Sequence, residues 1–391
     1  MTLKEEALAF HEKYRGKLAI ESKVPLKTQH DLSLAYTPGV AEPCKEIKKN
    51  PNLAFKYTSK WNTVAVVTDG SAVLGLGDIG AVASLPVMEG KALLFKKFAR
   101  IDSVPICIDS KNVEEIVKTV KLIAPSLGGV NLEDISAPRC FEIEDILKKE
   151  LDIPVFHDDQ HGTAIVVLAA TKNALKLAGK NFSDCKFAIN GAGAAGTALA
   201  KNLSSKKAKE VIVCDSKGII FEGRENLNWA KQELAKITNP KKIQGNLARA
   251  VKDADVFIGV SVAGALTQDM IKTMAEKPII FAMANPDPEI PPEKAKDAGA
   301  FIVATGRSDY PNQVNNVLGF PGIFRGTLDV QAKLISDGMK NAAVQALANL
   351  VGDKLSEDYI LPNPLDEQVV PTIASAVALK AKQEGLAICE K

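Results

Sequence analysis

Three glycines at positions 191, 193 and 196 constrain the fold of this chain more than any other feature of its sequence. An apolar run at residues 186–190 precedes them, and small or apolar residues recur after them at helical intervals, at Ala195, Ala198, Leu199 and Leu203. This order predicts a strand, a tight turn and a helix. Gly191 would permit the turn, Gly193 would let the backbone approach an anion, and Gly196 would let the helix pack close to the strand. The stretch therefore predicts a phosphate-binding turn at a helix start.

A second apolar run, at residues 211–214, ends in Asp215, nineteen residues after Gly196. Dinucleotide-binding units place an acid about twenty residues after the turn, where it binds a ribose. The two features predict NAD or NADP binding, rather than a glycine turn that only joins two elements. Asp215 favours a free 2′-hydroxyl and hence NAD, although Lys217 would soften the repulsion of a 2′-phosphate, so NADP stays open. The predicted cofactor-binding residues of the turn are Gly191, Ala192, Gly193, Ala194, Ala195 and Gly196.

Further short apolar runs lie on both sides of the glycine turn, at residues 63–68, 104–108, 256–260, 279–283 and 301–304. Helical patterns separate them, and such alternation predicts parallel α/β sheets. A chain of 391 residues is longer than a single core usually fills. We therefore expect an α/β chain of two domains, residues 1–155 and residues 156–391, the second a doubly wound Rossmann-like domain with C-terminal helices.

The composition argues against two classes of partner. Lys and Arg number 49 and Asp and Glu 47, and the two signs are mixed along the chain, which gives no general attraction to nucleic acid or to a membrane. No stretch reaches the roughly eighteen apolar residues of a spanning helix, and the first residues lack the apolar region of a signal peptide. The six cysteines form no C-x-x-C pair, which indicates reduced thiols. We expect a cytoplasmic protein with a small-molecule substrate.

Two pairs of adjacent acids, Glu133 with Asp134 and Asp158 with Asp159, follow short apolar segments. Adjacent side chains on a helix diverge by about 100°, whereas at a strand end or in a loop both can turn toward one point. Carboxylates with no cysteine nearby suit Mg²⁺ or Mn²⁺ better than zinc. Either pair alone could be a solvated loop, but both lie on the approach to the predicted dinucleotide domain, which favours a site for a divalent cation.

His157 and His161 form a pattern close to the H-E-x-x-H zinc motif. That motif needs both histidines on one face of a helix. Here we expect them in a turn, between a strand that ends at Phe156 and a helix that starts near Gly162. We therefore predict hydrogen-bonded turn histidines rather than zinc ligands.

A second G-x-G-x-x-G pattern occurs at Gly75, Gly77 and Gly80. The strand that follows it ends at Asp109, twenty-nine residues after Gly80, which is too far for a ribose-binding acid. We therefore predict that this loop binds no dinucleotide and that it positions Lys91 instead.

Nine short motifs, taken together and in this order, resemble those of the malic enzymes in their compact prokaryotic form. They lie at residues 36–39, 67–70, 74–80, 90–91, 133–134, 156–163, 191–196, 285–286 and 315–316. The resemblance implies an N-terminal malic domain that binds substrate, followed by the dinucleotide-binding domain. It also implies oxidation of L-malate with NAD(P)⁺ and a divalent metal, Mg²⁺ or Mn²⁺, and decarboxylation of the product to pyruvate and CO₂.

The resemblance also implies a role for each matching residue. Lys91 matches the general base that accepts the C2 hydroxyl proton, and Tyr36 matches the acid that protonates C3 of the enolate. Because a base must be neutral, a lysine beside a metal in a closed site would need a lowered pKa. The other matches are metal ligands at Glu133, Asp134 and Asp159, an auxiliary acid at Asp158, and residues that hold substrate or the nicotinamide end at Asn285, Asn315 and Asn316.

One position departs from the family pattern. Larger malic enzymes carry an arginine where this chain has Ala72, so a substrate carboxylate must find another donor. Asn285, Asn316 and a main-chain N–H near Gly39 are the candidates, and the sequence does not choose among them.

Two alternatives to oxidative decarboxylation stay open. One is a malolactic-type or oxaloacetate-decarboxylating enzyme with no net NADH, and the other is a non-catalytic NAD(P)-sensing module. The presence of Lys91, Tyr36 and the complete acid set argues against the sensor. The resemblance further implies a homodimer or higher homo-oligomer, in which the segment that carries Tyr36 could come from the partner chain.

Overall fold

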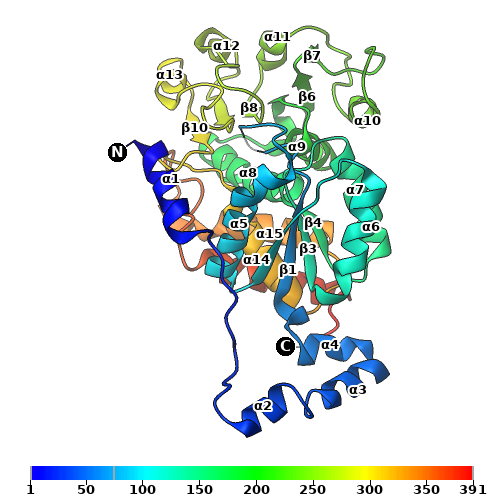
Figure 1. The fold of residues 1–391 in the computed structure, drawn as a ribbon. Coiled ribbons are helices and arrows are strands. Elements are labelled where there is room, and N and C mark those ends of the chain that lie inside the picture. The colour runs from blue at the N-terminus through cyan, green and yellow to red at the C-terminus, as the bar shows by residue number, and fades with distance from the viewer. Residues whose placement is uncertain (1, 74, 390–391) are drawn as a thin grey trace.

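The computed structural model describes residues 2–73 and 75–389; Leu74, in the second glycine pattern, lies outside the described residues. The chain forms two parallel sheets with helices around and between them (Figure 1). The first sheet has the order β2-β1-β3-β4, with all strands parallel. Its strands are β1 Thr63–Thr68, β2 Asp102–Cys107, β3 Gly129–Leu132 and β4 Val155–His157.

The second sheet has the order β10-β9-β8-β5-β6-β7. All of its pairs are parallel except β6 with β7, an antiparallel edge that the sequence analysis does not predict. From β5 the chain first goes to β6 on one side and then to β8 on the other, which is the switch point where doubly wound sheets bind ligands. The strands are β5 Lys186–Asn190, β6 Glu210–Asp215, β7 Gly218–Ile219, β8 Val256–Gly259, β9 Ile279–Ala282 and β10 Ile302–Thr305.

Successive side chains of each strand face opposite sides of its sheet, and they contribute to three hydrophobic clusters. In β1, Val64 and Val66 face a cluster shared with α5 and with the second sheet, while Ala65 and Val67 face α6 and α7. In β5, Phe187 joins the shared cluster, and the opposite face of that sheet packs on a third one. The helices beside the first sheet are α5 Gly80–Ala99, α6 Val113–Ile123 and α7 Arg139–Glu150.

Helix α8, Asp158–Ala178, is buried along most of its length and packs against α9, Ala194–Ser205, and α15, Asp337–Leu350. The sequence predicts that this helix starts near Gly162, and the structure starts it four residues earlier, at Asp158. The prediction was wrong there because the polar run at residues 157–163 resembles a loop. Two acids at the start of a helix are, however, favoured by its dipole.

The remaining helices surround the second sheet and close over the first. Phe320 and Phe324 of α14 pack edge-on against Phe95 of α5. Met339 and Leu347 of α15 are buried in the shared core. These helices are α9 Ala194–Ser205, α10 Trp229–Ile237, α11 Leu247–Val251, α12 Gln268–Lys272, α13 Pro292–Asp297, α14 Phe320–Asp329, α15 Asp337–Leu350 and α16 Val369–Gln383.

The N-terminal segment forms an arm of four helices, α1 Leu3–Tyr14, α2 Gln29–Ala35, α3 Ala41–Lys49 and α4 Ala54–Tyr57. None of the residues that the structure describes in these helices is buried. Figure 1 shows α2 and α3 standing away from both sheets. An extended segment without regular structure joins α1 to α2. Helix α1 ends at Tyr14, its C-cap Arg15 lies in the left-handed region, and residues 15–28 are not helical.

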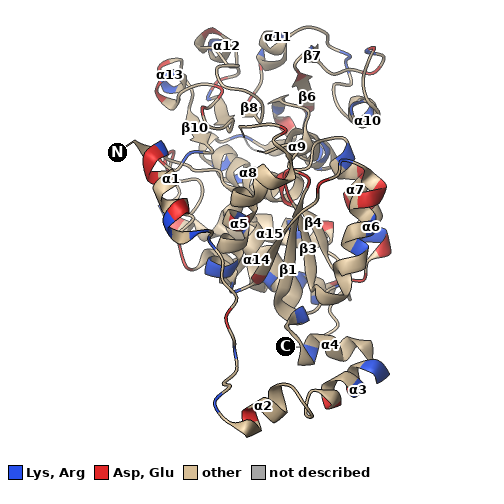
Figure 2. Cartoon of the chain, in the orientation of Figure 1, with Lys and Arg blue, Asp and Glu red and all other residues tan. Residues whose placement is uncertain are grey.

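Charges of both signs share the outer helices α3, α6 and α7 (Figure 2), as the mixed sequence predicts. Within the described chain, no helix combines the length and the apolar character needed to cross a membrane.

Candidate active site

The predicted glycine turn joins β5 to α9 at the switch point. Gly191 has φ of 117°, which glycine adopts readily. A Cβ at Gly196 would lie 1.9 Å from the Gly191 carbonyl oxygen, so α9 can approach the turn only with glycine there. A Cβ at Gly193 would meet no described atom within 4 Å, which leaves the start of α9 open to an anion.

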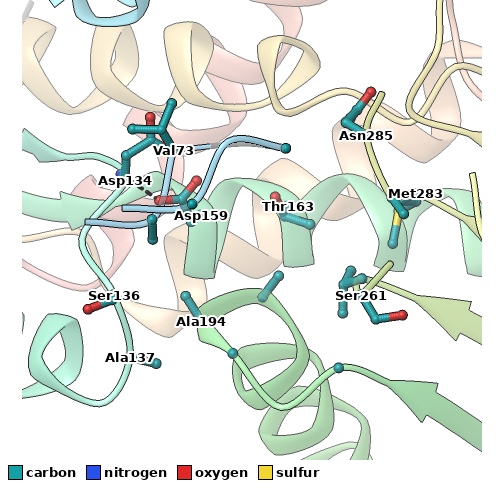
Figure 3. A pocket seen from close by; sticks show the side chains of 18 of the residues that line it. Val73, Asp134, Ser136, Ala137, Asp159, Thr163, Ala194, Ser261, Met283 and Asn285 are labelled. Atoms are coloured by element: carbon teal, nitrogen blue, oxygen red, sulfur yellow. Dashed lines mark hydrogen bonds between the residues drawn. The ribbon is translucent and has the colours of Figure 1, made fainter. Parts of the chain in front are cut away.

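The turn opens into a cavity of about 1670 Å³ between the two sheets. Figure 3 shows its two sides: Asp134 and Asp159 lie at one end, Asn285 and Met283 at the other, and Ala194 at the start of α9 below them. The cavity also reaches Lys91, Glu133, Asp215, Asn315 and Asn316. The structure therefore brings most of the predicted residues to one cavity; among the described residues, Tyr36, Asp158 and Gly196 are predicted but do not line it.

Asp215 is the last residue of β6, and it contacts two basic side chains that the sequence pattern does not predict. Its Oδ1 accepts a hydrogen bond from the Lys217 backbone N–H at 2.9 Å, and its Oδ2 lies 2.6 Å from Arg224 and 2.7 Å from Lys231. Burial alone would raise its pKa, but Arg224 and Lys231 outweigh burial and lower the pKa to about 2. The carboxylate is thus ionised, and its charge is shared with two cations.

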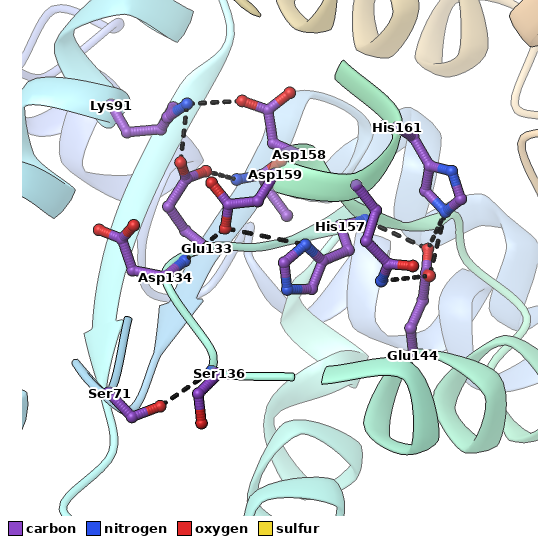
Figure 4. A network of polar contacts seen from close by, with 12 residues as sticks. Ser71, Lys91, Glu133, Asp134, Ser136, Glu144, His157, Asp158, Asp159 and His161 are labelled. Atoms are coloured by element: carbon purple, nitrogen blue, oxygen red, sulfur yellow. Dashed lines mark hydrogen bonds and ion pairs between the residues drawn. The ribbon is translucent and has the colours of Figure 1, made fainter. Parts of the chain in front are cut away.

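The predicted acids Glu133, Asp134, Asp158 and Asp159 gather at the ends of β3 and β4 (Figure 4). Oxygen atoms from Glu133, Asp134 and Asp159 all lie within 4.8 Å of one another. Asp134 has φ of 53°, the left-handed region. This backbone breaks the alternation of a strand, in which neighbours face opposite sides. The consecutive carboxylates of Glu133 and Asp134 can therefore face the same position in the cavity.

Asp158 and Asp159 behave differently from the predicted loop pair. They are the first two residues of α8, and as helix neighbours they diverge. Asp158 Oδ2 accepts from Lys91 Nζ at 2.6 Å, while Asp159 Oδ2 accepts the Asp134 backbone N–H at 2.9 Å. One acid thus faces the lysine and the other faces the acid cluster.

Lys91 lies on α5 and is buried, with Nζ 2.9 Å from Glu133 Oε1 as well as 2.6 Å from Asp158. The expected lowering of its pKa does not occur in the structure. Burial does lower the pKa, but Asp158 and then Glu133 outweigh burial and raise it. The sequence-based expectation did not include these two carboxylate partners, which keep the amine protonated.

The donor set fits a divalent cation. Burial, and then repulsion from Asp159 and Glu133, raises the pKa of Asp134 far above its usual range, and burial also raises those of Glu133 and Asp159. Asp134 Oδ2 is buried without a hydrogen-bond partner among the described residues. One lysine cannot balance the negative charge of four neighbouring carboxylates. A set of oxygen ligands suits Mg²⁺ or Mn²⁺. Glu133, Asp134 and Asp159 would hold the ion.

The two histidines are separated by the start of α8. His157 is the N-cap residue, and His161 lies within the first turn of the helix, so the predicted turn location was wrong for His161. His161 Nε2 lies 2.9 Å from Glu144 Oε1, whereas His157 Nδ1 lies 3.8 Å from Asp159. His161 is hydrogen-bonded as predicted, whereas both ring nitrogens of His157 are buried without a hydrogen-bond partner among the described residues.

The three asparagines reach the cavity from two loops. Asn285 precedes Pro286 in a cis peptide, and Asn315 uses its side-chain oxygen to accept the Val317 backbone N–H at 3.0 Å. Asn316 lies near Asp158, since a Cβ on Gly162 would touch both residues. Asn285 and Asn316 line the cavity, and the Asn316 side chain also hydrogen-bonds to Asp158, whereas Asn315 is engaged as a helix cap.

Tyr36 is the one predicted catalytic residue that the structure places elsewhere. It is 68% exposed at the end of α2, on the N-terminal arm. Among the described residues that line the cavity, Tyr36 does not occur. Ala72, in the position of the missing arginine, donates its backbone N–H to the Asp134 carbonyl at 2.9 Å and so supports the acid cluster.

Sequence reasoning did not identify several residues of the site. Glu144 contacts the start of α8, Arg224 and Lys231 flank Asp215, and Lys17 lines the cavity beside α5. Each of the four contacts residues that are not its neighbours in the sequence, so no local motif predicts it.

Fold and site together define a two-sheet α/β protein with a dinucleotide turn and an acidic cation site in one cavity. The model of the malic enzyme N-terminal domain matches residues 15–148, and that of the malic enzyme NAD-binding domain matches residues 160–382. The chain belongs to the malic enzyme family.

Individual relatives agree with this assignment. The chain is 60% identical over 389 residues to a bifunctional malic/malolactic enzyme of Bacillus subtilis, covering 99% of this chain and 95% of that protein. It is 51% identical over 403 residues to an NADP-dependent malic enzyme of Rhizobium meliloti, covering 98% of this chain but 52% of that protein. The crystal structure of the NAD-dependent malic enzyme from Thermotoga maritima matches with a TM-score of 0.92 and 49% identity, over 95% of this chain and 98% of that chain.

Proposed function

We propose that this chain oxidises L-malate with NAD⁺ or NADP⁺ and decarboxylates the product to pyruvate and CO₂, with a divalent cation. The observation that carries the proposal is the meeting of Lys91 and the Glu133–Asp134–Asp159 cluster with the glycine turn in a single cavity. Hydride transfer needs the nicotinamide, the substrate C2 and a proton acceptor within contact of one another, and this cavity can hold all three.

Lys91 and Asp158 act as a pair in this proposal. Lys91 is protonated at rest, so it must release a proton before it can accept one from the C2 hydroxyl. Asp158 lies 2.6 Å from the amine, and burial raises its pKa well above the usual value for an aspartic acid. Asp158 is therefore placed to take the lysine proton, and a bound divalent cation would favour this transfer because its charge would repel the ammonium group and leave a neutral amine facing the substrate. When bound, a divalent cation would supply Lewis-acid stabilisation of the charge that develops on the substrate oxygen.

The proton that C3 of the enolate receives needs a weak acid, and Tyr36 fills this role in the proposal. Because the exposed arm holds Tyr36 away from its own cavity, we propose a homodimer in which the arm of one copy reaches the cavity of the other. The apolar side chains of the arm support this: Leu32 and Leu34 are 48% and 63% exposed, and a dimer contact would cover such surface.

Mixed dimers test the origin of Tyr36. A heterodimer of one Lys91→Ala subunit and one Tyr36→Phe subunit retains a single intact site if the tyrosine acts across subunits. Such a heterodimer, purified with two different tags after co-expression, is expected to give about half the activity of the wild-type dimer, as two-fold symmetry requires. If each tyrosine serves its own subunit, both sites are defective and the heterodimer is as inactive as the two variant homodimers.

Cofactor choice should depend on the charges around Asp215. We propose a preference for NAD that Arg224 and Lys231 keep small, because their charges offset the repulsion of a 2′-phosphate. Asp215→Ala is expected to lower the ratio of kcat/KM for NAD over NADP by about tenfold, the size of one charged hydrogen bond. Lys231→Met should raise the same ratio. An unchanged ratio in both variants would remove Asp215 from the ribose site.

The direct test of the proposed function follows NAD(P)H and pyruvate together, with L-malate, Mn²⁺ and each cofactor in turn. Pyruvate formed in step with reduced cofactor is the expected result. Lactate without net NADH would favour the malolactic alternative, for which the name of the Bacillus subtilis relative gives a specific reason. Nucleotide binding without turnover would favour the sensing module.

The division of the chain into residues 1–155 and 156–391 also stays a proposal. Its support is that the two family matches end at residue 148 and begin at residue 160, on either side of β4.

A further inference from the structure

Glu144 on α7 is buried, and donors surround its carboxylate (Figure 4). Oε1 accepts the His157 backbone N–H at 3.2 Å, Oε2 accepts Gln160 Nε2 at 3.1 Å, and His161 Nε2 lies 2.9 and 3.0 Å from the two oxygens. Lys148, one turn further along α7, pairs with Oε1 at 2.5 Å. Since an ionised carboxylate can only accept, His161 carries its hydrogen on Nε2.

Three of these four partners belong to residues 157–161, which include Asp158 and Asp159. His157 is the N-cap of α8, and within the described chain its side chain makes no capping bond. In a capping box, the third helical residue reaches back to the N-cap N–H. Here that residue is Gln160, and it bonds to Glu144 instead, while Glu144 itself accepts the N-cap N–H. A carboxylate from another helix thus completes the cap.

We propose that Glu144 is a positioning residue, which fixes the first turn of α8 so that Asp159 faces the cation site and Asp158 faces Lys91. Asp158 and Asp159 are consecutive residues of α8, so their side chains point about 100° apart around the helix axis. A small rotation of this turn would therefore move both carboxylates away from their partners. Outer partners that orient metal-binding residues commonly contribute 10–100-fold in metal affinity. The inference rests on the proposed function, because it takes Asp159 to be a cation ligand.

The test is Mn²⁺ binding to Glu144→Gln, measured by calorimetry or by the electron paramagnetic resonance of free Mn²⁺. Glutamine keeps the shape but turns an amide N–H toward one of the donors. The Kd for Mn²⁺ is expected to rise by about 10–100-fold, while the Kd for NAD⁺ stays unchanged. Glu150→Gln is the matched control on the same helix, since Glu150 pairs with Lys121 and is 42% exposed. It should leave both constants as in the wild type.

The outcomes separate this inference from the proposed function. If Asp159→Asn weakens Mn²⁺ binding but Glu144→Gln only lowers the melting temperature, Glu144 is merely structural and the inference is overturned. If Asp159→Asn itself leaves Mn²⁺ binding unchanged, the cation site is misassigned and the inference fails with it. Should Glu144→Gln not fold, Gln160→Met removes a single donor and is expected to raise the Kd for Mn²⁺ in the same direction; an unchanged Kd would overturn the inference.

Discussion

Replacing Lys91 with alanine is expected to lower the rate of malate oxidation by about 10³-fold, within the range that a positioned general base contributes. The variant removes the group that faces the substrate. It also removes the positive charge that pairs with Glu133 and Asp158. Because the glycine turn lies on separate elements, β5 and α9, NAD⁺ binding should be nearly unchanged. Steady-state kinetics with Mn²⁺, together with cofactor titration by fluorescence, measure the two effects.

A loss of the ion pair also affects stability, so folding must be controlled. Removing one partner of a buried pair typically costs about 3–5 kcal/mol, and thermal unfolding of Lys91→Ala should show this loss. Lys96→Ala is a suitable comparison on the same helix, since Lys96 pairs with Asp102 and is 54% exposed. Equal loss of malate oxidation and of NAD⁺ affinity in Lys91→Ala would contradict the assigned role.

Replacing Asp134 with asparagine is expected to change stability in opposite directions under two conditions. Without divalent metal, the variant relieves repulsion from Asp159 and Glu133, so its melting temperature should rise, on the order of 2 °C for about 1 kcal/mol. With Mn²⁺, the wild type gains stability by binding, whereas the variant should gain little. Malate oxidation should fall by at least about 100-fold, more than changing an outer partner costs.

Differential scanning fluorimetry in EDTA and across Mn²⁺ concentrations measures both parts of this prediction. Asp145→Asn, on the neighbouring helix α7, serves as a control for a lost carboxylate and should shift the melting temperature equally under both conditions. A variant that melts lower than wild type in EDTA would show that Asp134 stabilises the fold, and repulsion among the acids would not be the dominant effect.

Local patterns were enough to predict most of the fold. The valines of residues 63–68 form β1 within the predicted bounds, and the strand and glycines of residues 186–196 form the predicted turn. Both succeed because their signals are local: β-branched runs prefer strands, and a positive φ selects glycine. The family resemblance then named the acids that the structure brings together.

The start of α8 could not be predicted by the same reasoning. Its N-cap is a histidine, and the carboxylate that completes the cap comes from Glu144, thirteen residues earlier on another helix. Propensity and capping patterns describe neighbours along the chain, so a cap formed by a tertiary contact leaves no signature. The same holds for Asp215, whose charge is set by Arg224 and Lys231, and for Tyr36, whose proposed partner is a second copy.

The shared hydrophobic cluster affects how the chain unfolds. Val64 of β1 and Phe95 of α5 belong to the same cluster as Phe187 of the second sheet, and Phe320 of α14 packs against Phe95 in that cluster. A core that is continuous between the sheets couples their stabilities, because losing either sheet would expose apolar surface on the other. The two sheets are therefore expected to unfold together, in a single cooperative transition.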